Sequence, residues 1–139
     1  MIAVDTSVLV DLLGDDSLAD AAMDSLRLAI SQGPVVVCDV VVSEIVAGFG
    51  RSAQLVDTLE EMGLRFSALE LRAAVRAGEM QRRYNERAQA AGKRPRSPRT
   101  VPDFLIGAHA LLQCQGLITR DAGFFRDYFK GLKVIVPQA

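Results

Sequence analysis

The sequence predicts an α/β fold, a single-domain α/β/α sandwich with a mostly parallel central sheet that spans residues 1–139. Short apolar runs alternate with longer segments of helical periodicity, and such alternation is typical of a parallel sheet covered by helices on both faces. Half of the 139 residues are apolar, which is enough for one sizeable core. We find no internal repeat and no change in composition that marks a second domain.

The first strand is the apolar run at residues 1–4, and the oxygens of residues 5–7 can cap a helix that starts near Val8. Ser17 and Asp39 precede two later helices as caps, and the helices repeat their apolar residues at helical spacing. In order, the later elements are a helix at 18–31, a strand at 35–38, helices at 39–49 and 53–62, a strand at 64–66, helices at 68–91 and 103–115, a strand at 117–119, a helix at 122–129 and a strand at 133–136.

Composition argues against several classes of protein. No apolar run approaches the roughly 20 residues of a membrane span, and the N-terminus lacks a basic leader, so we expect a soluble, cytoplasmic protein. Cys38 and Cys114 are the two cysteines and stand far apart, which argues against a disulfide framework and a cysteine-based zinc site. His109 is the single histidine and is interpreted first as a core residue. Any chemistry is therefore expected from carboxylates.

The charges are nearly balanced, with 16 Lys and Arg against 17 Asp and Glu. This balance argues against a protein that coats nucleic acid by bulk charge. A solvated, proline-broken loop is the simplest interpretation of the basic segment KRPRSPR, and a local contact with RNA is the functional alternative. The residues that would make this contact are Lys93, Arg94, Arg96 and Arg99.

Four acidic residues follow or flank the predicted strands. Asp5 comes where the first strand ends, and Asp121 comes two residues after the fourth strand. Asp103 stands at a predicted helix N-terminus just before the fourth strand, and Glu44 stands in the helix after the second strand. Because ligands of open α/β sheets bind outside the carboxyl ends of the strands, we expect these four carboxylates to face the same edge.

Glu44 stands in a markedly apolar segment, VVVCDVVVSEIVAGF. An isolated buried carboxylate is costly, so Glu44 must be paired, bind a cation or reach a cleft. An ion pair with a residue such as Arg51 is the structural alternative. Asp5, Asp103 and Asp121 have a structural alternative as helix caps, and the convergence of all four acids favours a common site.

Carboxylates that share a site repel one another unless a cation lies among them. Their hard oxygen atoms suit Mg²⁺ or Mn²⁺. A water bound to such an ion is a nucleophile for phosphodiester hydrolysis, and the ion stabilises the attacking and leaving oxygens. With metal and a basic segment nearby, the site would attract a nucleic-acid backbone rather than repel it.

Four segments carry these acids in sequence: IAVDTSVLVDLL, VVVSEIVAGF, PDFLIGAHAL and LITRDAGFF. Together they span nearly the whole chain, and as a set they resemble the PIN-domain nucleases, in particular the VapC-type toxins of bacterial toxin–antitoxin pairs. The first and last segments are the more specific ones. The chain departs from the family at His109, where a small residue is common, and in its longer and more basic KRPRSPR segment.

The resemblance implies a PIN-like nuclease domain and a Mg²⁺- or Mn²⁺-dependent endoribonuclease that hydrolyses RNA. It also implies a homodimer and a cognate antitoxin protein that blocks the active site. The site residues that it implies are the catalytic acids Asp5, Glu44, Asp103 and Asp121, of which Asp5, Asp103 and Asp121 hold the metal, and the auxiliary hydroxyl residues Thr6 and Thr119.

Other classes remain open at this point. A phosphate-accepting receiver domain has a similar size, but it pairs two acids after the first strand and places a lysine by the last, whereas here Asp-Thr-Ser follows the first strand and Lys133 precedes the last. A haloacid-dehalogenase-like phosphatase would need a second Asp at Ser7. A non-catalytic binding module and a PIN nuclease of RNA processing are further alternatives. The C-terminal aromatic residues are expected in the core rather than as stacking surfaces for bases: Phe124, Phe125, Tyr128 and Phe129.

Overall fold

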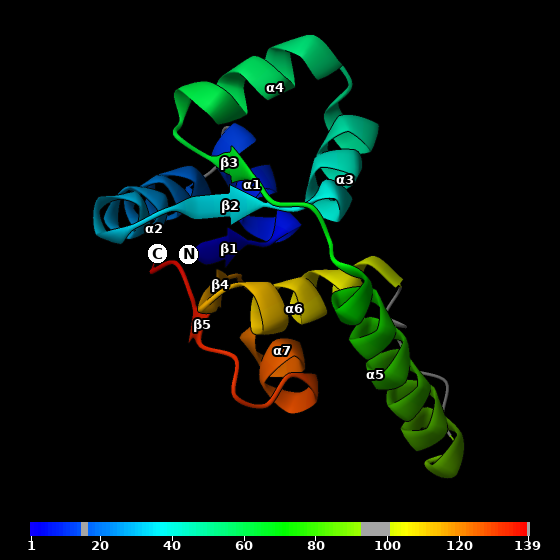
Figure 1. Cartoon of the computed structure of the whole chain (residues 1–139). Coiled ribbons are helices and arrows are strands. Elements are labelled where there is room, and N and C mark those ends of the chain that lie inside the picture. The colour runs from blue at the N-terminus through cyan, green and yellow to red at the C-terminus, as the bar shows by residue number, and fades with distance from the viewer. Residues whose placement is uncertain (15–16, 93–100, 139) are drawn as a thin grey trace.

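The computed structural model describes residues 1–14, 17–92 and 101–138 of the chain (Figure 1). In this part of the chain, five strands form one sheet with the order β3-β2-β1-β4-β5, and all neighbouring strands are parallel. The strands are β1 (Ile2–Val4), β2 (Val35–Val37), β3 (Arg65–Phe66), β4 (Gly116–Ile118) and β5 (Val134–Ile135). The helices are α1 (Thr6–Leu13), α2 (Leu18–Gln32), α3 (Asp39–Phe49), α4 (Ser52–Glu61), α5 (Leu71–Ala90), α6 (Val101–Gln113) and α7 (Ala122–Tyr128).

Strand β1 lies in the middle of the sheet, paired with β2 on one side and with β4 on the other. The chain runs outward from β1 to β3, crosses back to β4 and then continues outward to β5. Crossovers between parallel strands are right-handed. The helices that connect β1 to β3, α1 to α4, therefore lie on one face of the sheet, and the helices that connect β3 to β5, α5 to α7, lie on the other. The flavodoxin-like order of receiver domains has its first strand between the second and third, so this sheet excludes the receiver fold.

The predicted strands and helices are all present, and the sheet is fully rather than mostly parallel. Helix α1 begins at Thr6, two residues before the predicted start, and no side-chain hydrogen bond caps it. Helix α6 begins at Val101, so Pro102 and Asp103 lie inside its first turn instead of before it. Proline is tolerated there because the first N–H groups of a helix have no intrahelical partner. The proposed RNA contacts Lys93, Arg94, Arg96 and Arg99 lie outside the described residues.

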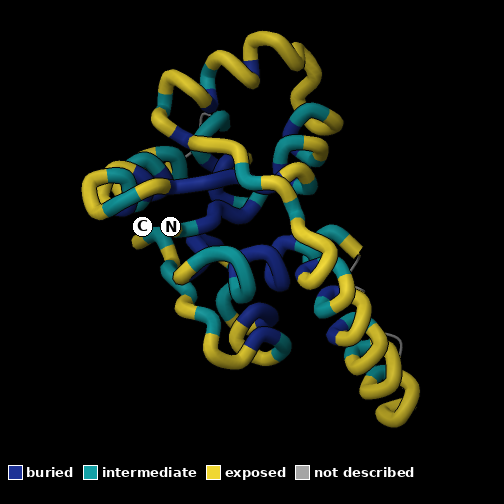
Figure 2. The backbone as a smooth tube through the Cα atoms, in the orientation of Figure 1, coloured by how far each residue is buried: buried dark blue, intermediate teal, exposed yellow. Residues whose placement is uncertain are grey.

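Helix α5 is largely exposed, and its C-terminal end extends away from the rest of the molecule (Figures 1 and 2). Ion pairs on its surface join Arg82 to Glu86 and Arg76 to Glu79. This agrees with a solvated helix that contacts the core along one side, where Ala73, Ala77 and Met80 are buried. Among the described helices, none combines the length and the apolar character that are needed to cross a membrane.

Aromatic side chains of α6 and α7 fill one part of the core. The ring centroids of Phe104 and Phe124 are 5.2 Å apart in an edge-to-face arrangement, which is a favourable geometry for aromatic pairs. All three phenylalanines of segment 124–129 are buried, as the sequence predicts. Tyr128 is half-buried and contacts Tyr84 of α5, with centroids 5.5 Å apart. These contacts join α5, α6 and α7 into one layer.

Gly107 lies in α6 against the buried ring of Phe129, and a Cβ atom at this position would overlap with that ring. We therefore expect Gly107→Ala to lower the free energy of unfolding by about 1–3 kcal/mol, although alanine is the better helix former. Gly78→Ala in α5 is the matched control, because nothing lies within 4 Å of its added Cβ. Chemical denaturation checks both variants, and a Gly107→Ala protein as stable as the control would contradict the expected clash.

Candidate active site

The candidate site lies where the strand order reverses, between β1 and β4. Val4 and Ile118 are paired at the carboxyl ends of these strands, and the next residues along the chain are Asp5 and Thr119. In open α/β sheets this reversal leaves a crevice in which ligands bind. Asp5 and Thr119 are both buried, at 6% and 0% exposure, so the sheet itself carries a carboxylate and a hydroxyl into the interior.

The Asp5 carboxylate is held by two hydroxyl groups. Thr119 Oγ1 donates a hydrogen bond of 2.6 Å to Asp5 Oδ2, and Ser7 Oγ donates one of 3.0 Å to the same oxygen. Asp5 occupies the position before α1, but its side chain makes no capping hydrogen bond to that helix. The structural alternative, an aspartate that caps a helix, therefore does not apply to Asp5.

The environment of Asp5 opposes its negative charge. Burial raises the pKa of the Asp5 carboxyl, hydrogen bonds from the hydroxyls of Thr119 and Ser7 and from the backbone of Thr6 lower it, and the charge of Asp103 raises it again. Burial is the largest of these effects, because a low-dielectric interior disfavours an ionised group. A cation beside Asp5 and Asp103 would relieve both the repulsion and the cost of burial.

Thr119 connects Asp5 to the third acid of the site. While its hydroxyl donates to Asp5, the same oxygen accepts a hydrogen bond of 3.0 Å from the backbone N–H of Asp121. Asp121 is half-buried at the position before α7, and its side chain makes no capping hydrogen bond. One buried hydroxyl thus fixes the loop that carries Asp121 against the carboxylate of Asp5.

Glu44 and Asp103 complete the set of acids. Thr6 Oγ1 donates a hydrogen bond of 2.7 Å to Glu44 Oε1, so the half-buried Glu44 is joined to the residue that follows Asp5. None of the ion pairs within the described ranges includes Glu44, and its alternative pairing with Arg51 is not formed. Asp103 is half-buried in the first turn of α6, close enough for its charge to act on Asp5.

The four acids therefore do not form one compact cluster. They are connected by the hydroxyl groups of Thr6 and Thr119 and by the electrostatic effect of Asp103 on Asp5. In residues 1–14, 17–92 and 101–138, no three His, Cys, Asp or Glu side chains lie close enough together to hold a metal ion. The donors are all hard carboxylate oxygens, and Mg²⁺ keeps several waters while it is bound by only one or two carboxylates. The donor set therefore fits a hydrated Mg²⁺ or Mn²⁺.

Sequence reasoning missed a second polar group beside the site, formed by Asp11 and Arg120. Asp11 of α1 is 4% exposed, and its Oδ2 lies 2.5 Å from Arg120 Nε. The backbone N–H of Arg120 also donates to Ser7 Oγ at 3.4 Å. The signal was present in the sequence, because Asp11 is an isolated acid in an apolar helix, as Glu44 is. This ion pair joins α1 to the loop that precedes Asp121.

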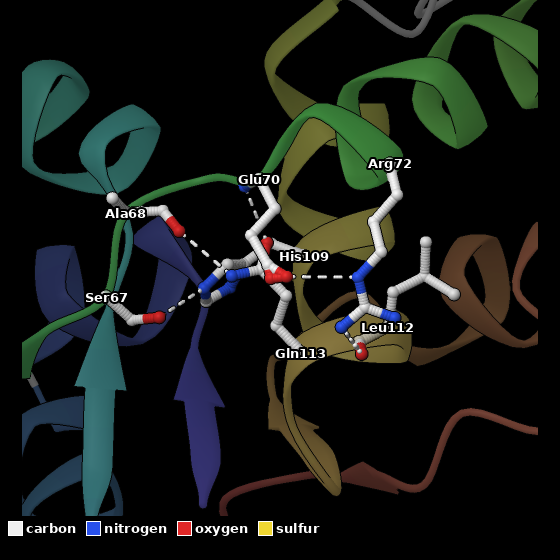
Figure 3. Close-up of polar contacts among 7 residues, drawn as sticks. All are labelled: Ser67, Ala68, Glu70, Arg72, His109, Leu112 and Gln113. Atoms are coloured by element: carbon white, nitrogen blue, oxygen red, sulfur yellow. Dashed lines mark hydrogen bonds and ion pairs between the residues drawn. The ribbon is translucent and has the colours of Figure 1, made fainter.

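His109 is a structural residue of α6, as the sequence analysis favours. It is 1% exposed, and its Nε2 lies 3.0 Å from Ser67 Oγ (Figure 3). One turn later, Gln113 Nε2 donates to the carbonyl of Ala68 at 2.9 Å and its Oε1 accepts the N–H of Glu70 at 2.9 Å. These contacts attach the segment after β3 to α6, on which Asp103 stands.

The burial of His109 predicts that the stability of the protein depends on pH. Burial lowers the pKa of His109, although the charges of Asp39 and Glu70 raise it, so between the folded value and 6.5 the unfolded chain binds more protons. We expect the stability contributed by neutral His109 to be complete above pH 6.5 and to be lost as pH falls below it. Unfolding temperatures from pH 7.5 to 5 check this. In His109→Gln this component should vanish, and an unchanged profile would contradict the assignment.

The protein is thus a parallel α/β/α sandwich that carries one buried carboxylate, Asp5, at the reversal of its strand order, with the half-buried acids of the candidate site around it. The chain belongs to the PIN domain family, whose model matches residues 2–130. This match confirms the resemblance to PIN-domain nucleases that the four sequence segments indicate. A comparison with curated protein sequences finds no significant match.

Several solved bacterial structures share this fold. The VapBC2 complex of Rickettsia felis bound to promoter DNA has a TM-score of 0.70 and 18% identity, covering 99% of this chain and 100% of the other. A toxin–antitoxin complex of Klebsiella pneumoniae has a TM-score of 0.64 and 20% identity, covering 99% and 98%. VapC20 of Mycobacterium tuberculosis, a sarcin-ricin loop cleaving toxin, has a TM-score of 0.63 and 20% identity, covering 96% and 99%. At these identities, the similarity is one of fold.

Proposed function

We propose that the protein is a metal-dependent endoribonuclease, with residues 1–139 forming one PIN-like nuclease domain. The observation that carries this proposal is the buried Asp5 carboxylate, held by Thr119 and Ser7 at the reversal of the strand order and exposed to the charge of Asp103. Such an arrangement lowers the stability of the folded protein when no cation is bound. Membership of the PIN domain family supports the interpretation that the arrangement serves a nuclease activity.

In this proposal Asp5, Asp103 and Asp121 hold a hydrated divalent ion, in part through its bound waters. Glu44 is either a further ligand or the residue that orients the attacking water. The ion, when bound, makes water a nucleophile at neutral pH and stabilises the charge that develops on the phosphate. Thr119 keeps the Asp5 carboxylate in one orientation. Thr6 does the same for Glu44 through its hydrogen bond of 2.7 Å.

We propose that the substrate is RNA and that the protein is the toxin of a toxin–antitoxin pair, with a cognate antitoxin and a homodimeric state. The support is the fold that it shares with a toxin–antitoxin complex and with a sarcin-ricin loop cleaving toxin. A PIN nuclease of RNA processing is the second candidate, and it would act without an antitoxin. The basic residues proposed to contact the RNA are Lys93, Arg94, Arg96 and Arg99.

The test is cleavage of a panel of structured RNAs by purified, antitoxin-free protein with Mg²⁺, Mn²⁺ or EDTA. DNA of the same sequences is the matched control. We expect RNA to be cut only with metal, and DNA to remain intact. Cleavage in EDTA would contradict the metal, and a protein that binds no Mn²⁺ in a titration is not the proposed enzyme. Stable labelling by a phosphoryl donor without RNA cleavage would favour a phosphate-accepting protein instead.

A further inference from the structure

A pocket of about 290 Å³ lies between α5 and α7, on the side of α6 that carries Leu111. Arg76, Arg83 and Arg87 of α5 line it, together with Lys130 just after α7. Asp127 and Tyr128 of α7 line it as well. Four cations thus share one small cavity with a single carboxylate, although the whole chain carries a net charge of −1.

These cations are poorly neutralised by the protein. Arg76 has one ion pair, a distance of 3.7 Å to Glu79. Within the ranges that the structure describes, no carboxylate lies within 4.0 Å of the charged nitrogens of Arg83, Arg87 or Lys130. Like charges that face one cavity repel each other, and a bound anion relieves that repulsion. The pocket is therefore electrostatically suited to an anionic group.

One cation of the pocket is held in place by an aromatic ring. The guanidinium of Arg87 lies over Tyr128, 5.3 Å from the ring centroid, within the range of a cation–π contact. Tyr128 is itself packed against Tyr84 and Phe124, with centroid distances of 5.5 and 5.4 Å. A fixed guanidinium loses less entropy when it binds a phosphate, and its planar fork matches phosphate oxygens.

The pocket is near the candidate active site but separate from it. Tyr128 is the last residue of α7 and Asp121 immediately precedes that helix, so about 10 Å of helix separates them. At the rise of about 3.4 Å per nucleotide of a stacked helical strand, this length corresponds to roughly three stacked nucleotides. Figure 1 shows α7 and α5 at the same end of the molecule. An RNA strand leaving the acidic site can reach the pocket.

We propose that this basic pocket binds a backbone phosphate of the RNA substrate, a few nucleotides from the bond that is cut. The proposal rests on the proposed nuclease function. The acidic site on its own repels a polyanion, whereas cations at the far end of α7 attract the same strand and fix its direction. Because contacts with phosphate carry no base information, the pocket contributes affinity and orientation, and sequence preference arises elsewhere.

The experiment measures binding of a short fluorescein-labelled single-stranded RNA by fluorescence anisotropy, in the Asp5→Asn background so that no cleavage occurs. Arg83→Gln, Arg87→Gln and Lys130→Gln each remove one pocket cation. Arg82→Gln is the matched control, because Arg82 is on the same helix but pairs with Glu86 at 3.1 Å and does not line the pocket. Unfolding temperatures are recorded for every variant to verify that each is folded.

We expect each pocket variant to weaken RNA binding roughly fivefold at about 0.1 M salt and to reduce the slope of log K against log salt by about 0.7. Arg82→Gln should leave both quantities nearly unchanged. Asp127→Asn removes the carboxylate of the pocket and should tighten binding. A gain in affinity from this variant has no explanation in misfolding, so it is the sharpest support for the proposal.

Equal losses in Arg82→Gln and the pocket variants would show an effect of bulk charge and overturn the proposal. Unchanged RNA binding by the pocket variants would also overturn the proposal, even if inorganic phosphate or a polyglutamate peptide binds the pocket. The two proposals fail separately. A wild-type chain that cuts no RNA, with pocket variants that still lose RNA affinity, contradicts the nuclease alone. A chain that cuts RNA, with pocket variants that bind as the control does, contradicts the pocket alone.

Discussion

Asp5→Asn is expected to abolish metal-dependent RNA cleavage, with a loss of about a thousandfold or more. Asn retains an oxygen that accepts from Thr119, so the shape of the site is preserved while its charge is lost. The divalent ion of the proposed mechanism stabilises several kcal/mol of charge in the transition state, and about 4 kcal/mol corresponds to a thousandfold in rate. Cleavage of RNA by the purified variant at saturating Mg²⁺ is the measurement, and wild-type activity would refute the assignment.

The same substitution should make the protein more stable when metal is absent. The folded state raises the pKa of Asp5 above its ordinary value of 3.8. The Asp5 carboxyl therefore lowers the stability of the folded protein as pH rises from 3.8 through the pKa of the folded state, and this cost persists at higher pH. Asn carries no such cost. In EDTA at neutral pH, the variant should therefore unfold at a higher temperature than wild type, and the difference should shrink below pH 3.8. A lower unfolding temperature would show that Asp5 has a structural role.

Thr119→Val is the second substitution with a large expected effect. It preserves the shape of the side chain but leaves Asp5 with one hydroxyl donor fewer and the Asp121 N–H without its acceptor. Unpaired buried polar groups cost about 1–3 kcal/mol, and loss of a residue that orients a metal ligand costs about 10- to 100-fold in activity or metal affinity. We expect losses of that size in unfolding free energy and in Mn²⁺ affinity.

The conservative variant separates the two roles of Thr119. Thr119→Ser keeps the hydroxyl and removes a methyl group, so it should restore Mn²⁺ affinity to within a few-fold of wild type while it remains somewhat less stable. Isothermal titration with Mn²⁺ and thermal unfolding measure both quantities on the same samples. If Thr119→Val binds Mn²⁺ as tightly as Thr119→Ser, the hydroxyl does not position the ligand.

The sequence predicts the alternation of elements well because each strand and helix has its own local pattern. Its prediction that acids gather at one edge follows from general rules for parallel sheets, and the structure does bring Asp5, Thr119 and Asp121 into one hydrogen-bonded chain. Local pattern alone does not predict the strand order, which places β4 rather than β3 beside β1. Which strand becomes the second neighbour of β1 depends on how the connecting helices pack on the sheet.

Cap predictions were the least accurate, for one physical reason. The sequence predicts that residues 5–7 cap α1, yet no side-chain hydrogen bond caps this helix. Asp5 and Thr6 bind the distant residues Thr119 and Glu44, and Ser7 donates to Asp5. A hydroxyl or carboxyl that prefers a local cap in an isolated helix changes partner when tertiary structure offers a better one. The pairing of Asp11 with Arg120 was missed in the same way, since it joins residues more than a hundred positions apart.

The hydrogen bond between Asp5 and Thr119 spans 114 residues of sequence. Pairing of β1 with β4 spans a similar length, and closing a loop of that size is among the slowest steps in folding. A ribosome would therefore have to synthesise the chain at least as far as Thr119 before the two halves of the site could meet. If the protein cuts RNA as proposed, this order of assembly keeps each nascent copy inactive until the residues of β4 and of the loop after it have been synthesised.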